Sequence, residues 1–212
     1  RDLCTDQGTK RNMTPETEDR LAIRDLIENW AVLRDARLWD EFRKVWHDDG
    51  VMQATWFQGT ADEFIKVSQE GYDKGVRILH FLGGMNIEIN ANRAIAQTKM
   101  TISQRGPVDG VICDVVCTGR FYDFLEKRFS KWGLVLRQPI YEKDRCDPVD
   151  PGATLKLDQD ILKLYPEGYR HLAYLQHKIG YKVKRDMPGL DGPELEALYA
   201  RGKVWLEGGP AT

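Results

Sequence analysis

The chain has 212 residues, of which 42% are hydrophobic and 30% are charged, and its formal net charge is −2. This balance is ordinary for a globular protein and lacks the basic excess that a nucleic-acid partner requires. No apolar run approaches the roughly 20 residues of a membrane span, so we expect neither a nucleic-acid nor a membrane partner.

Residues 14–75 predict three helices around one short strand. Thr14 caps the first helix, Pro15 occupies its first helical position, and apolar residues then recur at helical spacing as far as position 33. A second helix is expected over residues 38–50, a strand over 51–59 and a third helix over 61–75.

From residue 77 onward the pattern changes to long strands. Four of them follow in succession, broken by short turns, over residues 77–90, 93–105, 110–128 and 131–141. Consecutive strands with short connections predict an antiparallel meander. Helices followed by such a meander indicate an α+β fold in which helices cover one face of the sheet.

The segment after Tyr141 is rich in Pro and Asp, so it reads as a loop and a domain boundary. Beyond it, residues 146–212 predict a C-terminal helical extension with three helical pieces, each apolar along one stripe only. We expect the extension to pack on the core or on a partner subunit, where it would cover a pocket mouth or enlarge a dimer interface.

Neither the cysteines nor the N-terminus indicates a site. Cys113 and Cys117 share one strand face, and Cys4 and Cys146 lie far away in sequence, so no zinc-ligand spacing exists. Buried, reduced thiols are the simplest interpretation, and they favour a cytoplasmic protein. Residues 1–13 are expected to be a disordered or expression-derived tail.

Two residues are candidates for acid–base chemistry. His80 lies in the apolar stretch Ile78–Leu82, where it is either a core histidine with a satisfied ring or a base held by a partner. Asp35 lies at the C-terminal end of the first helix, where the helix dipole disfavours a carboxylate. It is either a surface turn residue or the partner of that base.

Several short patterns resemble the SnoaL-like branch of the nuclear transport factor 2-like superfamily. They are A-x-x-x-D-x-x-x-W-D at 31–40, Asp-Asp-Gly at 48–50, H-x-L-G at 80–83 and W-x-L-x-x-R at 132–137. The resemblance covers roughly residues 16–145. It implies a cone-shaped barrel of curved antiparallel sheet, spanning 14–145, whose N-terminal helices enclose a pocket.

The family includes scytalone and bile-acid dehydratases, ketosteroid isomerase, polyketide cyclases, hexachlorocyclohexane dehydrochlorinase and lyases of lignin-derived diaryl compounds. The resemblance therefore implies a cofactor-independent lyase that eliminates water or formaldehyde from a hydrophobic hydroxylated aromatic compound, with lignin-derived compounds as one candidate class. A steroid- or polyketide-type isomerase or cyclase is the alternative, as is a non-catalytic binding protein of the same fold. A homodimer or homotrimer is expected.

The resemblance also assigns roles to single residues. The dyad of the dehydratases matches Asp35 and His80, and their last-strand arginine matches Arg137. Some dehydratases carry a tyrosine where this chain has Trp30, so we expect a phenol acid elsewhere. Tyr72, Tyr122 and Tyr141 are the candidates, and we choose Tyr141, which shares a strand face with Arg137. Without the resemblance, Arg137 reads equally well as an outer-face residue and Tyr141 as a strand-end aromatic.

Aromatic residues complete the predicted site. Trp56, Phe57 and Phe81, together with Trp30, would supply substrate-binding surface, although Trp56 and Phe57 also fit ordinary core packing. The remaining histidines, expected on helices, are His47, His171 and His177. They lack metal-ligand spacing, and no phosphate-binding or dinucleotide-binding glycine motif appears, so we expect no metal and no cofactor.

Overall fold

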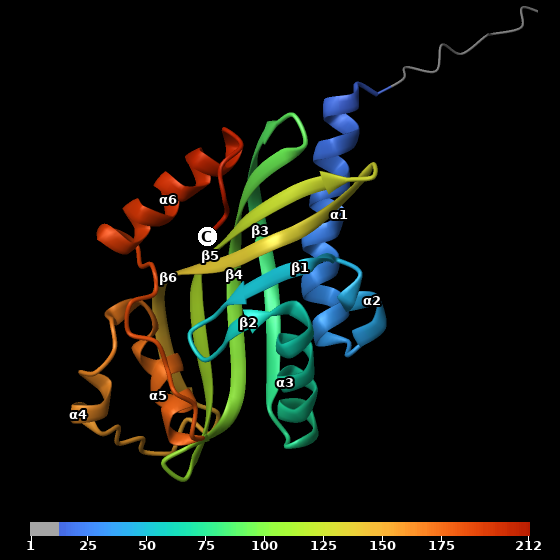
Figure 1. Ribbon diagram of the computed structural model, residues 1–212. Helices are drawn as coiled ribbons and strands as arrows, with labels where there is room; N and C mark the ends of the chain where they lie inside the picture. Colours follow the sequence, from blue (N-terminus) through green and yellow to red (C-terminus); the bar gives the residue numbers. More distant parts are fainter. Residues whose placement is uncertain (1–12) are drawn as a thin grey trace, which may run out of the picture.

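The computed structural model describes residues 13–212, so the predictions for Cys4 and for most of the N-terminal tail lie outside the described residues. In chain order the helices and strands are α1 (Pro15–Asp35), α2 (Trp39–Arg43), β1 (Trp46–Gln53), β2 (Gln58–Thr60), α3 (Ala61–Asp73), β3 (Arg77–Asn90), β4 (Arg93–Val108), β5 (Val111–Arg128), β6 (Lys131–Pro148), α4 (Gln159–Leu162), a 3-10 turn η1 (Glu167–Tyr169), α5 (Arg170–Lys178) and α6 (Pro193–Leu206). The predicted α+β plan is confirmed, with helices before and after one curved sheet (Figure 1).

Local chemistry fixes the ends of the N-terminal helices. The Thr14 hydroxyl accepts a hydrogen bond from the backbone N–H of Thr17 at the start of α1. At α3, Thr60 and Glu63 form a capping box in which each side chain binds the other residue's backbone N–H. Both helices therefore begin where the sequence predicts, and this sets the position of their buried faces against the sheet.

The sheet has six strands in the order β2-β1-β6-β5-β4-β3. Strands β3 to β6 form the predicted antiparallel meander, while β1 runs parallel to β6 and pairs with β2 on its other side. The sheet is curved but not closed into the expected barrel, and a register shift between Leu82 and Met85 bends β3 at its Gly-Gly pair. The glycines therefore form a bulge inside one continuous strand.

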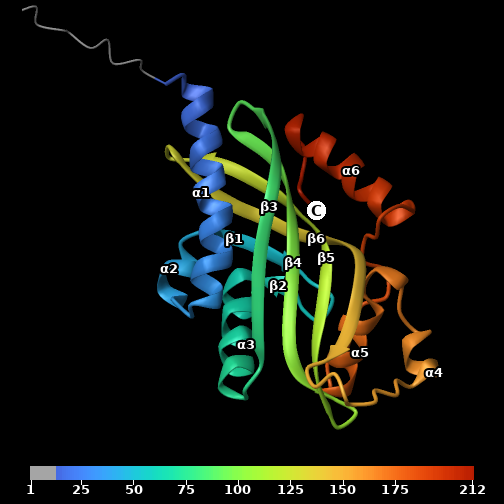
Figure 2. The same ribbon diagram turned by 180° about the vertical axis from the view of Figure 1, so that it is seen from behind.

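The two faces of the sheet carry different helices. On the inner face, α1, α3, η1 and α5 pack into the larger apolar core, which includes Ile27, Phe64 and Tyr169. On the outer face, α6 covers a smaller cluster through Leu198 and Trp205. Both ribbon views show α1 and α3 along β3 at one side of the molecule and α6 at the other (Figure 2).

Several predicted segments are wrong, and the single strand expected over 51–59 is divided between β1 and β2. The second helix ends at Arg43, because the chain then enters β1, where Trp46 pairs with Leu134; His47 therefore lies on a strand and not on a helix. Residues 142–148, predicted as a loop, extend β6, and residues 143–148 of them pair with β5 from Cys113 to Thr118. In the latter two places pairing with a neighbouring strand outweighs local sequence preference.

The predicted C-terminal extension is only partly helical. The piece expected around residues 153–165 contains only the four-residue α4, whereas η1 with α5 and α6 occupy the other two predicted positions. No helix among residues 13–212 is long and apolar enough to cross a membrane.

Candidate active site

The candidate site is built around Asp35 and His80. Asp35 is the last residue of α1, and β3 passes beside it. Its carboxylate accepts two hydrogen bonds from His80, at 2.8 Å from the ring Nδ1 and at 2.5 Å from the backbone N–H. A second attachment holds this end of the helix, because the Tyr72 hydroxyl donates to the backbone carbonyl of Asp35 at 3.2 Å.

This geometry determines the form of the imidazole. A carboxylate only accepts hydrogen bonds, so Nδ1 carries the ring proton and Nε2 keeps its lone pair. Burial is the largest cause that lowers the pKa of His80 to about 4, and the hydrogen bond to Asp35 opposes it. At neutral pH the ring is therefore an uncharged base with one fixed tautomer.

Aromatic rings fix the orientation of His80. Its ring meets Trp30 edge to face, with centroids 5.2 Å apart and an interplanar angle of 87°, and a tilted Phe121 ring lies 6.1 Å away. The His80 side chain is only 5% exposed. The base therefore has little freedom to rotate away from its carboxylate partner.

His80 lines an internal cavity between the helices and the sheet. The space open to the centres of water molecules is about 30 Å³, which is enough for one or two waters. The walls are formed by Trp30, Arg34, Met52, Ala54, Thr55, Trp56, Phe64, Ile78, His80, Ile102, Gln104, Pro139, Tyr141, Leu172 and Gln176. Most of this wall is apolar, and its polar groups come from several different elements.

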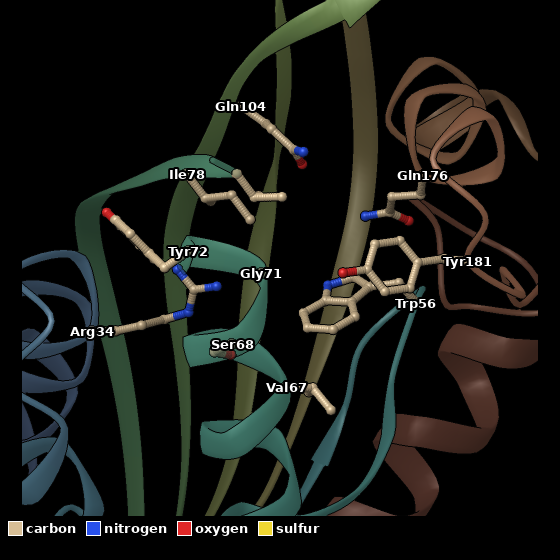
Figure 3. Close-up of a pocket in the computed structure, with 11 residues that line it drawn as sticks. Arg34, Trp56, Val67, Ser68, Gly71, Tyr72, Ile78, Gln104, Gln176 and Tyr181 are labelled. Carbon is tan, nitrogen blue, oxygen red and sulfur yellow. The ribbon is translucent and has the colours of Figure 1, made fainter. Parts of the chain in front are cut away.

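A second hollow of about 20 Å³ adjoins the first and shares Arg34, Trp56, Ile78, Gln104 and Gln176 with it. Figure 3 shows Arg34 entering this hollow from the α1 side, opposite Trp56, Gln176 and Tyr181. The two hollows form one pocket with two arms, which we call the His80 arm and the Arg34 arm.

The C-terminal extension closes the far wall of the pocket. The Thr55 hydroxyl donates to the Gln176 side chain at 2.8 Å, and the Lys184 backbone N–H donates to the Thr55 carbonyl at 2.8 Å. Beside them the rings of Trp56 and Tyr181 lie 5.1 Å apart. The segment after β6 therefore contributes directly to the pocket wall.

Two of the predicted binding residues, Trp30 and Trp56, line the pocket, as does Tyr141, the predicted phenol acid. Burial is the main cause that raises the pKa of the Tyr141 phenol, so the phenol keeps its proton at neutral pH and can donate a hydrogen bond. Phe81 does not belong to the site. It is 74% exposed, because adjacent strand residues point to opposite faces and His80 takes the inner one.

Phe57 and Arg137 also lie outside the pocket lining. Phe57 packs against Phe64, with ring centroids 5.5 Å apart, and is therefore a core residue, contrary to the prediction. Arg137 is fully buried and forms two hydrogen bonds of 2.7 Å to Asp123, with its guanidinium 4.2 Å from the Trp30 ring. Arg137 therefore packs against Trp30, which lines the pocket, and does not face the pocket itself.

Three polar residues that line the pocket were not predicted from the sequence, namely Arg34, Gln104 and Gln176. Arg34 follows Trp30 by four residues and so lies on the buried stripe of α1, where a charged residue is unusual. This break in an apolar stripe was the available signal. Gln104 and Gln176 carried no such signal, because their placement depends on how β4 and α5 meet.

A second histidine–aspartate pair tests how specific the first one is. His171 binds Asp144 through Nδ1 at 2.8 Å and through its backbone N–H at 2.6 Å, which matches the Asp35–His80 pair closely. His171 lies at the start of α5 and lines neither arm of the pocket, and Asp144 also accepts the backbone N–H of Leu172. The Asp144 carboxylate caps the start of α5. The two histidine–aspartate pairs therefore have the same geometry, and only His80 faces a cavity.

Among residues 13–212, no group of three or more His, Cys, Asp or Glu side chains is arranged to hold a metal ion.

Known proteins with similar sequences and structures agree with this architecture. The model of the SnoaL-like domain matches residues 15–138. A PEP2-like protein of Fusarium vanettenii is 40% identical over 201 residues, covering 90% of this chain and 86% of that protein. Pea pathogenicity protein 2 of the same fungus is 38% identical over 211 residues, covering 93% of this chain and 91% of that protein.

Solved structures share the fold at low identity. A putative scytalone dehydratase of Novosphingobium aromaticivorans superposes with a TM-score of 0.53 and 16% identity, covering 65% of this chain and 97% of that one. A hexachlorocyclohexane dehydrochlorinase of Novosphingobium barchaimii superposes with a TM-score of 0.54 and 12% identity, covering 67% of this chain and 97% of that one. The chain therefore belongs to the SnoaL-like family and has the nuclear transport factor 2-like fold.

Proposed function

We propose that this protein is a cofactor-independent lyase that uses His80 as its general base. The observation that carries the proposal is a neutral histidine, fixed in one tautomer by Asp35, inside an apolar cavity. A base of this kind removes a proton efficiently when it is oriented and desolvated. The family supports acid–base chemistry, since dehydratase and dehydrochlorinase structures share its fold.

The reaction would proceed through Nε2. This atom takes a proton from the substrate, and the Asp35 carboxylate stabilises the imidazolium that forms. The same imidazolium can then protonate the leaving oxygen, so that water departs and the histidine returns to its neutral form. Tyr141, protonated and in the same wall, can donate a hydrogen bond to that oxygen.

The pocket walls indicate the class of substrate. Trp30 and Trp56 offer flat aromatic surface, and the other apolar residues of the wall are mostly aliphatic. We infer a hydrophobic, hydroxylated and preferably aromatic compound, with elimination of water or formaldehyde as the reaction. Because the present cavity holds only one or two waters, substrate entry requires the wall at Trp56 and Tyr181 to move.

The test is a comparison of turnover among His80→Gln, Asp35→Asn and the control His171→Gln. A panel of hydroxylated aryl ketones and lignin-derived diaryl compounds would be incubated with each protein and the products identified by mass spectrometry. We expect loss of water or formaldehyde at the full rate with wild type and His171→Gln only. Turnover at the wild-type rate in His80→Gln would refute the proposed base.

The product also separates the lyase from its alternatives. A rearranged product of unchanged mass would indicate an isomerase or cyclase that uses the same base. Binding of panel compounds without any His80-dependent turnover would indicate a binding protein of the same fold.

A further inference from the structure

Arg34 is a buried cation with few partners. Its side chain is 4% exposed. Within residues 13–212 its guanidinium makes one polar contact, from Nη1 to the Asp35 carboxylate at 3.4 Å. Its Nε is buried and has no hydrogen-bond partner among those residues. A guanidinium has five N–H groups, so most of the hydrogen-bonding capacity of this one is unused.

Asp35 does not neutralise Arg34 in the way that Asp123 neutralises Arg137. The short hydrogen bonds of Asp35, at 2.8 and 2.5 Å, go to His80, while Arg137 has two bonds of 2.7 Å to its own carboxylate. Burial lowers the pKa of Arg34 and Asp35 opposes this, which shows the cost of holding the charge away from water. Arg34 also lines both arms of the pocket, which Arg137 does not, so its guanidinium is the one placed to bind a ligand there.

Other buried polar side chains line the same arm, and one of them lacks a hydrogen-bond partner among the described residues. Ser68 on α3 lines the Arg34 arm, is 5% exposed, and its hydroxyl has no hydrogen-bond partner among the described residues. Gln104 is also buried and lines both arms. Figure 3 shows the guanidinium directed between α3 and β3, toward the interior of the pocket. An oxygen placed here would find a cation and a hydroxyl, while the base lies in the adjoining arm.

We propose that Arg34 and Ser68 form an oxyanion-binding subsite, and that the substrate places there a carbonyl oxygen that becomes an enolate oxygen. The proposal rests on the proposed function for the reaction, and it names the substrate class as β-hydroxy carbonyl compounds. A buried guanidinium binds such an oxygen more strongly as its negative charge develops, which lowers the barrier to proton removal.

The electron balance of the step is complete within the substrate and His80. The Cα–H bond breaks, its proton goes to His80 Nε2, and its electron pair forms the enolate whose oxygen lies at Arg34. The enolate then collapses, the Cβ–O bond breaks, and the departing hydroxide takes the proton back from the imidazolium. The products are an α,β-unsaturated carbonyl compound and water, and no oxidant or cofactor is needed.

The test uses 4-nitrophenol, an aromatic probe whose phenol and phenolate forms have different absorption spectra. Its apparent pKa when bound would be measured by titration in wild type, Arg34→Gln, Arg34→Lys and Ser68→Ala. We expect the bound pKa to be about 1 unit or more lower in wild type than in Arg34→Gln, since an opposite charge at close range shifts a pKa by 1–3 units. Arg34→Lys should retain part of that shift.

The same titration in the His80→Gln background separates this inference from the proposed function. In His80→Gln no histidine is available to take the proton of the probe, so the proton goes to solvent. The difference in bound pKa caused by Arg34 should therefore persist even if His80 proves not to be catalytic. If Arg34→Gln does not fold, Arg34→Lys and Ser68→Ala still test the subsite. Equal bound pKa values in wild type and all variants, or failure of wild type to bind the probe, would overturn the proposal.

Discussion

The state of His80 predicts how the stability of the protein depends on pH. In the unfolded chain His80 takes up a proton as the pH falls below its ordinary pKa of 6.5, whereas the folded protein resists protonation until about pH 4. Between these values the unfolded state binds more protons, so the free energy of unfolding decreases as the pH falls through this window. Above about pH 7 the contribution of His80 is fully present.

The magnitude follows from the two pKa values. Each pKa unit of difference between the two states corresponds to about 1.4 kcal/mol. At a pH low enough to protonate His80 in both states, the free energy of unfolding would therefore be about 3 kcal/mol lower. Of this, roughly 2 kcal/mol should be lost between about pH 7 and about pH 5. For a domain of ordinary stability, that is a readily measurable fraction of the total.

The assay is urea unfolding of wild type and His80→Gln at both pH values. Carboxylates that titrate in this range contribute equally to both proteins, so they cancel in the comparison. The stability of wild type should fall by roughly 2 kcal/mol more than that of His80→Gln. An equal fall in both proteins would show that His80 titrates near its ordinary pKa, and the reasoning about burial would be wrong.

Further predictions concern activity and the buried ion pair. The rate constant kcat/KM should keep its full value down to about pH 5 and fall near pH 4, because burial holds the pKa of His80 there. Asp35→Asn should lower kcat by roughly 10²–10⁴ in the same assay, because the imidazolium loses its carboxylate; a smaller loss than tenfold would count against the dyad. Tyr141→Phe should lower kcat while leaving the thermal unfolding temperature nearly unchanged, and an unaltered kcat would exclude the phenol as hydrogen-bond donor. Arg137→Leu should reduce stability in urea by about 3–5 kcal/mol, because it leaves Asp123 buried without its counterion; replacing Asp123 with Leu as well should restore most of it.

The meander and the two longer N-terminal helices, α1 and α3, could be predicted because their signals are local. Caps such as Thr14 and Thr60, alternating strands and short turns each act within a few residues. The errors occur where distant chain segments decide the outcome. Trp46 becomes a strand residue through its pairing with Leu134, and Glu142 through the pairing of its strand with β5.

The candidate site shows the same division. Strand alternation excludes Phe81 once His80 faces the pocket, so this error could have been avoided from sequence. The partner of Arg137 could not be predicted in that way, because Asp123 meets it only through the register of β5 with β6. Arg34 was detectable as a charge on a buried helical stripe, but its lack of partners appears only in three dimensions.

The proposed chemistry depends on a neutral His80 whose ring proton is held on Nδ1 by Asp35. The most direct measurement is ¹⁵N NMR of the histidine rings across pH, with His80→Gln to assign the signal. We expect a protonated Nδ1, an unprotonated Nε2 and a midpoint of ring protonation near pH 4. A midpoint near 6.5, or a proton on Nε2 in the neutral ring, would contradict this expectation.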